Sequence, residues 1–193
     1  MDIRDRKLAQ LITQYSLGVK PGDKVVLRAG TQAEPLLKEL FRQIIEAGAH
    51  PVLWPDFGWP EELLYSLGSD EQISFIHKPT ALYYEEYDCL IRVLSEENTK
   101  HLNSVDPRKI TLFSKSRAEL MNTYMDRSAR GELRWALTLY PTNAYAQDAD
   151  MSLDEYADFV YKACMPDMND PVGYWRGISE RQARIIEWLK GKK

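Results

Sequence analysis

The sequence predicts an α/β domain with an open, doubly wound, mostly parallel sheet of about four to five strands and helices on both faces. Short apolar runs alternate with longer amphipathic segments along the 193 residues. Residues 24–54 contain a strand, a helix and a second strand, which together require a right-handed parallel connection. A chain of this length that is 44% hydrophobic is large enough to bury one core, so we expect residues 1–193 to form a single domain.

The first third of the chain supplies two of the strands. Apolar residues recur at helical spacing from Leu8 to Tyr15 and predict a helix over 3–17. The short runs 24–29 and 50–54 are the first two predicted strands. Between them, Thr31 and Glu34 have the spacing of a capping box. The helix that follows is expected to bury the face formed by Leu37, Leu40, Phe41 and Ile44.

The middle of the chain is less regular. A short helix is expected over 60–67 and another short element over 71–76, whereas 81–87 fits either a helix or a strand. Residues 89–94 form the third predicted strand. A long helix, with a possible break, is expected from the N-cap Asp106 to Ala129. Its expected inward residues are Ile110, Phe113, Met121, Tyr124 and Met125.

The last third begins with a fourth strand over 133–139. Ser152 and Glu155 form a second capping box, and Asp170 with Pro171 starts the final helix. Two apolar stripes are expected to face the core in these helices: Tyr156, Phe159, Val160 and Ala163 in the first, and Trp175, Ile178, Ile185 and Leu189 in the second.

Composition excludes several classes of protein. Lys and Arg number 25 against 29 Asp and Glu, and a formal charge of −4 argues against a nucleic-acid partner. No segment has the length and apolar character of a membrane helix, and the amino-terminal residues lack a signal-peptide core. We therefore expect no membrane partner and a cytoplasmic location. Cys89 and Cys164 are expected to be reduced structural thiols.

Known catalytic motifs are missing from the sequence. It contains no dinucleotide fingerprint, phosphate-binding loop, nucleophile elbow or zinc-binding HExxH helix. None of His50, His77 and His101 has a nearby histidine or carboxylate at ligand spacing. The adjacent pairs 61–62, 85–86 and 96–97 are all glutamates, which we interpret as solvated loop charges. We therefore predict no catalytic residue, no metal ligand and no cofactor within this chain.

Ligands of open α/β sheets bind beyond the carboxyl ends of the strands, which here are residues 30–32, 55–59, 95–98 and 140–143. The last of these ends is the most suggestive. After the fourth strand, Tyr140, Thr142, Asn143 and nearby Gln147 emerge together and are candidates for lining a substrate cavity. An equal alternative is that Thr142 or Asn143 only caps a short helix.

Tryptophans mark a second candidate region. Trp54 and Trp59 flank a loop rich in large rings, which lines a pocket, packs on a partner or anchors the loop to its own domain. Trp135 and Trp188 sit in apolar patterns and are expected in the core.

Four segments together resemble a known family over nearly the whole chain. They are residues 8–25, 46–51, 135–156 and 175–191. In these segments the sequence resembles the thermophilic aminopeptidase T/aminopeptidase S family of two-metal exopeptidases. The stretch from Trp135 through the Tyr140-Pro141-Thr142 corner to Tyr156 carries the most specific similarity.

The resemblance implies that this chain is the amino-terminal domain of a metal-dependent aminopeptidase that releases N-terminal amino acids from peptides. Members are about twice as long, and two divalent ions (Zn, Co or Mg) are held in the half without a counterpart here. The resemblance therefore implies a catalytic domain absent from this chain, a peptide substrate and a homodimer in the parent enzyme. Residues 1–193 alone are predicted to be inactive and to contribute cavity wall and domain packing.

The fold class alone also permits two other functions. One is a free-standing module that binds a small molecule at the strand ends. The other is a protein-interaction module that uses its aromatic loops.

Overall fold

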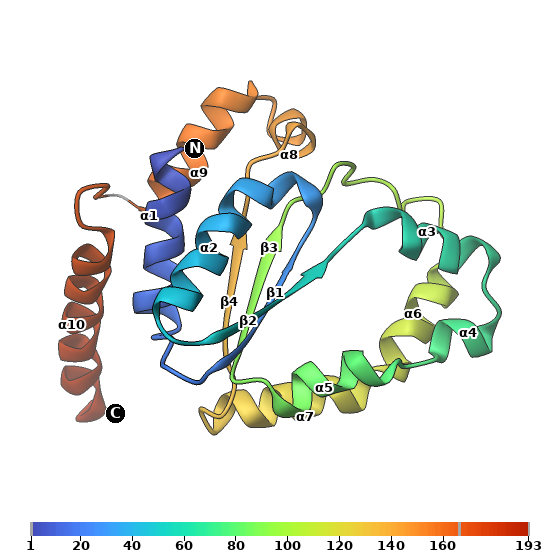
Figure 1. The fold of residues 1–193 in the computed structure, drawn as a ribbon, viewed down its shortest axis with the longest axis horizontal. Helices are drawn as coiled ribbons and strands as arrows, with labels where there is room; N and C mark the ends of the chain where they lie inside the picture. Colours follow the sequence, from blue (N-terminus) through green and yellow to red (C-terminus); the bar gives the residue numbers. More distant parts are fainter. Residues whose placement is uncertain (1, 166, 193) are drawn as a thin grey trace.

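A computed structural model describes residues 2–165 and 167–192 (Figure 1). Its centre is a four-stranded sheet of order β2-β1-β3-β4, in which each neighbouring pair is parallel. The strands are β1 Lys24–Ala29, β2 His50–Pro55, β3 Cys89–Leu94 and β4 Arg134–Leu139. All four lie where the sequence predicts them to within about one residue, and the predicted α/β class is confirmed.

Helices lie on both faces of the sheet, with α1 and α2 on one side and α5 and α7 on the other (Figure 1). The α-helices are α1 Ile3–Leu11, α2 Glu34–Glu46, α3 Gly58–Leu67, α4 Asp70–Ser74, α5 Lys78–Glu86, α6 Pro107–Ser116, α7 Ala118–Ala129, α8 Asn143–Asp148, α9 Leu153–Cys164 and α10 Pro171–Lys190. The chain therefore winds in both directions from β1, which has β2 on one side and β3 on the other.

The main core lies between the sheet and helices α1 and α2. Val25 and Leu27 of β1 are fully buried there, together with Leu40 and Ile44 of α2. Full burial of such a side chain contributes roughly 1.5–3 kcal/mol to folding. Because strand residues alternate between faces, Val26 and Arg28 point to the opposite face of the sheet.

The predicted helices are confirmed with local differences. The helix expected over 3–17 ends as a π-helical turn, Ile12–Ser16, in which the Leu17 amide bonds the Ile12 carbonyl at 3.0 Å. Arg117 breaks the long helix expected after Asp106 into α6 and α7. The ambiguous residues 81–87 belong largely to the helix α5.

One of the two predicted capping boxes is wrong. A short 3-10 helix, Thr31–Ala33, precedes α2, whose N-cap Ala33 has no side-chain cap. The Thr31 hydroxyl instead donates to the Glu97 carboxylate at 3.3 Å. The box of Ser152 and Glu155 at the start of α9 is confirmed.

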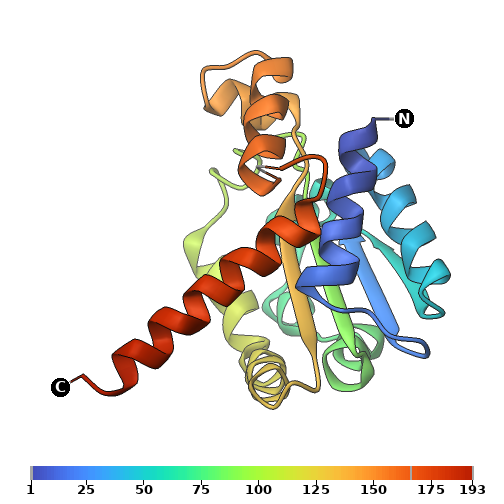
Figure 2. The ribbon, with the colours of Figure 1, turned by 90° about the vertical axis from the view of Figure 1, so that its left-hand side faces the viewer.

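Several apolar side chains that were expected inside are exposed, and these expectations are wrong. Trp135 is 51% exposed because α5 and α7 cover only part of its sheet face, and Trp188 is 64% exposed. Trp188 lies in the outer half of α10, which projects from the body of the molecule (Figure 2). The other exposed residues are Phe41, Met121, Met125, Phe159, Ala163, Ile185 and Leu189. Helical periodicity identifies an apolar face but does not say what covers it.

The two cysteines are free thiols, as predicted. Burial raises the pKa of Cys89 to about 12, which keeps this thiol protonated and unreactive at neutral pH. In the part of the chain that the structure describes, no helix is both long enough and apolar enough to cross a membrane.

A buried carboxyl group joins the first helix to α9. Asp5 in the first turn of α1 is 1% exposed and accepts a hydrogen bond from the Tyr161 hydroxyl. The Arg4 guanidinium lies 4.6 Å from the centre of the same tyrosine ring and pairs with Asp158. Burial raises the pKa of Asp5 above 3.8, so its ionised form opposes folding.

We expect Asp5→Asn to stabilise the protein at neutral pH. The amide keeps an oxygen for the Tyr161 hydroxyl and removes the buried charge. Because the folded pKa of Asp5 is raised, its stabilising contribution is full below pH 3.8 and is lost as pH rises through the folded value. The variant should therefore gain about 2–4 °C in Tm at pH 7, roughly 1 kcal/mol, and little at pH 3.

Asp154→Asn provides the matched control for thermal unfolding measurements. Asp154 also lies in the first turn of a helix, α9, but it is exposed. Its replacement should leave Tm within about 1 °C or lower it slightly, because an exposed carboxylate favours a helix N-terminus. A loss of stability in Asp5→Asn at pH 7 would contradict the assigned cost of burial.

Candidate functional site

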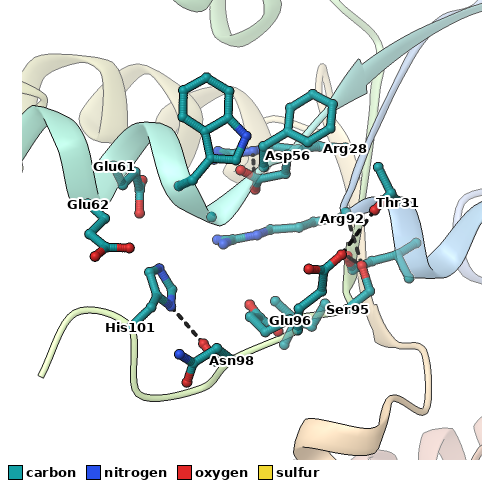
Figure 3. Close-up of a pocket in the computed structure, with 17 residues that line it drawn as sticks. Arg28, Thr31, Asp56, Glu61, Glu62, Arg92, Ser95, Glu96, Asn98 and His101 are labelled. Atoms are coloured by element: carbon teal, nitrogen blue, oxygen red, sulfur yellow. Dashed lines mark hydrogen bonds and ion pairs between the residues drawn. The ribbon is translucent and has the colours of Figure 1, made fainter.

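A pocket of about 280 Å³ opens at the carboxyl ends of β1, β2 and β3 (Figure 3). Its walls come from these strand ends, the first turn of α3 and the loop that follows β3. The chain reverses its winding direction between β1 and β3, and open α/β sheets bind ligands at such a reversal. The pocket therefore lies where the fold class predicts a ligand site.

Gly30 allows the three strand ends to converge. A Cβ atom at this residue would lie 3.0 Å from the Ser95 hydroxyl oxygen, 3.1 Å from the Ser95 carbonyl and 3.3 Å from the Asp56 carbonyl. The Gly30 amide donates to the Ser95 hydroxyl at 3.0 Å. Space favours glycine here, since a Cβ would force its neighbours to shift by a few tenths of an ångström, whereas the φ of −72° is open to any residue.

Two arginines extend from the sheet into the pocket. Arg28 and Arg92 are register partners on β1 and β3, so they lie side by side on one sheet face. Arg28 donates to the Asp56 carboxylate at 3.0 Å. Burial disfavours the Arg28 charge, but the combined effects of Asp56, Tyr83 and Tyr84 raise the guanidinium pKa. Among the described residues Arg92 has no hydrogen-bond or ion-pair partner, and Figure 3 shows it extended across the pocket.

Acceptor groups occupy the opposite wall. Glu96 in the loop after β3 has a buried carboxylate oxygen, Oε2, without a hydrogen-bond partner among the described residues. The same holds for Nε2 of His101. The other ring nitrogen, Nδ1, is 2.7 Å from the carbonyl of Asn98 and must carry a proton to bond it. In the neutral ring Nε2 is therefore an acceptor.

Further carboxylates surround this wall. Glu61 and Glu62 of α3 line the pocket on the side of His101 (Figure 3). Glu97 accepts hydrogen bonds from Thr31 and from Gln32, the latter at 3.0 Å. Together with Asp56 and Glu96, these three glutamates bring the carboxylates of the pocket to five. The guanidiniums of Arg28 and Arg92 offset two of them, so the lining has a formal charge of −3. The pocket is thus acidic overall, with its cations confined to the sheet.

Of the residues predicted to line a cavity, Trp59 lines this pocket and five do not. Trp54 packs edge-on against Tyr83, with ring centres 5.8 Å apart. Asn143 and Gln147 are exposed on α8. Tyr140 packs against the main core, where burial and the nearby Asp5 raise its pKa.

Thr142 joins the end of β4 to the loop after β3 without lining the pocket. It is 4% exposed and caps α8, accepting from the Tyr145 amide. Its hydroxyl donates to the backbone carbonyl of Glu96 at 2.8 Å. The alternative of a helix cap therefore describes Thr142, which also holds the chain that carries Glu96.

Sequence reasoning named the strand ends that form the pocket as ligand-binding positions but favoured the end of β4, and it did not assign Arg28, Arg92 or His101 to a site. The interpretation of 96–97 as solvated loop charges is wrong for Glu96, whose Oε2 is buried. Arg28 and Arg92 each interrupt an otherwise apolar strand, and this pattern in the sequence could have identified them as candidates for a site. His101 could not be assigned, because its contacts come from the folding of an irregular loop.

The fold and the pocket define an α/β domain with a ligand site at the reversal of its sheet. The chain belongs to the thermophilic metalloprotease (M29) family, whose model matches residues 2–193. It is 26% identical over 207 residues to aminopeptidase 2 of Geobacillus stearothermophilus, covering 97% of this chain and 48% of that protein. The resemblance seen in the sequence is therefore confirmed.

A solved structure gives the same fold. Wild-type AmpT from Thermus thermophilus matches with a TM-score of 0.74 at 16% identity, covering 96% of this chain and 48% of that one. At this identity the match shows the fold alone. The chain spans about half the length of both relatives.

Metal chemistry is implied by the family, and the donors of this chain do not fit a metal centre. Within residues 2–165 and 167–192, no three His, Cys, Asp or Glu side chains form a group that could hold a metal ion. The carboxylates of the pocket are divided among the residue after β2, helix α3 and the loop after β3 rather than converging on one point. We therefore derive no metal-dependent step from these residues.

We expect Gly30→Ala to destabilise the protein by about 1–3 kcal/mol, because the new methyl group displaces the backbone of Ser95. Urea unfolding measures this loss. Gly177→Ala is the control, since a Cβ at Gly177 in α10 meets nothing within 4 Å. The control should be stabilised by about 0.5–1 kcal/mol, and equal effects at the two glycines would contradict the close approach.

Proposed function

We propose that this chain is the amino-terminal domain of a metal-dependent aminopeptidase that releases N-terminal amino acids from peptides. The observation that carries this proposal is the match of the M29 family model to residues 2–193. The name of the Geobacillus relative, aminopeptidase 2, gives the activity, and the half-length coverage leaves room for a separate catalytic domain. That domain would hold the divalent ions.

The pocket supports a role in forming the wall of the substrate cavity. A peptide substrate presents a positively charged terminal ammonium group, which an acidic wall attracts. The pocket has this character, with a formal charge of −3 and Trp59 at its rim. Lining such a cavity requires no metal ligand from this domain.

Exposed apolar residues support a second role, in packing against the catalytic domain. Ile185, Ile186, Trp188 and Leu189 of α10 are each more than half exposed. A helix with a large exposed apolar stripe commonly packs on another part of the protein. The homodimer, the cytoplasmic location and the choice among Zn, Co and Mg stay predictions.

A chimera tests the proposed function. Residues 1–193 would replace the matching half of Geobacillus aminopeptidase 2, and release of leucine from leucyl p-nitroanilide would be measured with Co²⁺, Zn²⁺ or Mg²⁺. We expect an active chimera and no activity from the 193-residue chain alone. Metal-dependent leucine release by the chain alone would contradict the proposal, as would a folded but inactive chimera beside an active parent.

The wall role predicts a specific kinetic change in that chimera. Trp59→Ala should raise KM by about threefold to tenfold through lost apolar contact, with kcat unchanged within about twofold. Phe159→Ala is the control, because Phe159 is an equally exposed aromatic residue on α9, outside the pocket. It should change neither constant. If kcat falls and KM does not change, the wall role of Trp59 is wrong.

A further inference from the structure

The unpartnered atoms of the pocket identify the chemistry of a ligand. Oε2 of Glu96 and Nε2 of His101 are buried without a hydrogen-bond partner among the described residues. Both accept hydrogen bonds when the ring is neutral, so a matching ligand must donate. A primary ammonium group has three donors and a charge opposite to that of Glu96. It therefore fits this wall better than a neutral or anionic group.

The opposite wall offers a hydrogen-bond donor to the ligand, because the exposed Arg92 lines the pocket. Arg28 already has Asp56, whereas the described residues provide no partner for Arg92. Guanidinium groups bind carboxylates with two parallel hydrogen bonds. Since Arg92 and Glu96 line the same small pocket, one compact molecule with both an ammonium group and a carboxylate suits it.

The rim of the pocket adds an apolar element. Phe57 and Trp59 are 43% and 62% exposed, with ring centres 6.4 Å apart. Both line the pocket at the start of α3. Exposed rings at the mouth of a polar cavity provide a surface for an apolar side chain of the ligand.

We propose that this pocket binds a small zwitterion with an apolar side chain, that is, a free α-amino acid or a dipeptide. The ammonium group bonds Glu96 and His101, the carboxylate bonds Arg92, and the side chain packs on Trp59. This inference rests on the proposed wall role of the same pocket and deepens it by naming the groups of the ligand that each residue binds, and binding itself needs no second domain.

Calorimetric titration of the 193-residue chain with matched ligands tests the proposal. L-leucine and L-leucyl-L-leucine present all three elements, and whichever binds more tightly identifies the ligand as an amino acid or a dipeptide. N-acetyl-L-leucine lacks the ammonium group, L-leucinamide lacks the carboxylate and glycine lacks the side chain. We expect each loss of a charged group to weaken binding by about tenfold or more, and glycine to bind more weakly than leucine.

Two variants assign each charged group to its protein partner. Arg92→Gln should weaken leucine by about tenfold and leave leucinamide unchanged, because leucinamide has no carboxylate to lose. Glu96→Gln should weaken leucine and leucinamide alike and leave N-acetyl-L-leucine unchanged. Arg108→Gln is the control, since Arg108 is almost fully exposed on α6, outside this pocket, and its loss should change no affinity.

Several outcomes would overturn the inference. One is no heat from leucine or leucyl-leucine up to about 10 mM, well above a Kd of about 1 mM, with a chain shown to be folded by circular dichroism. Equal affinity for leucine and N-acetyl-L-leucine is another, and it needs no variant. If Arg92→Gln weakened leucine and leucinamide equally, the carboxylate would be assigned wrongly. An inactive chimera would contradict the proposed function and leave this binding result intact.

Discussion

The close approach of three strand ends at Gly30 is the constraint on which the pocket depends. Because this residue has no Cβ, the end of β1 can lie against Ser95 after β3 and Asp56 after β2. The resulting register places Arg28 of β1 beside Arg92 of β3. A larger residue would separate the strand ends and with them the groups that line the pocket.

The positive and negative side chains of the pocket lie on different backbone elements, so the fold keeps them apart. The guanidinium groups project from central strands, whose positions are fixed by ladder hydrogen bonds, whereas most carboxylates come from α3 and from the loop after β3. Only Asp56 reaches across to neutralise an arginine, Arg28. Thr142 fixes the acidic loop by bonding the Glu96 carbonyl. The pocket is therefore polarised, with a cationic sheet side and an acidic loop side.

Sequence reasoning located the sheet and the strand ends that form the pocket, but it assigned few of the side chains there correctly, for one physical reason. Strands such as β1 and β3 are short buried runs, and local pattern is enough to identify them. Side chains that depend on tertiary packing were misassigned. Thr31 bonds Glu97 rather than capping a helix, and Trp135 remains exposed because α5 and α7 cover only part of the sheet. His101 and Glu96 acquire their roles from loops that meet only in the folded chain.

An ammonium group and a metal ion both need carboxylate oxygens, but they need them in different arrangements. A metal requires three or more ligands converging at about 2 Å, which fixes several side chains around one point. An ammonium group is satisfied by separate acceptors at hydrogen-bond distance, on a wall whose net charge is negative. The acceptors here are of the second kind, since Asp56 is paired to Arg28 and Glu97 to Thr31, while Glu96 is held in a different loop position. The carboxylates that do not form a metal centre here are therefore suited to an organic cation.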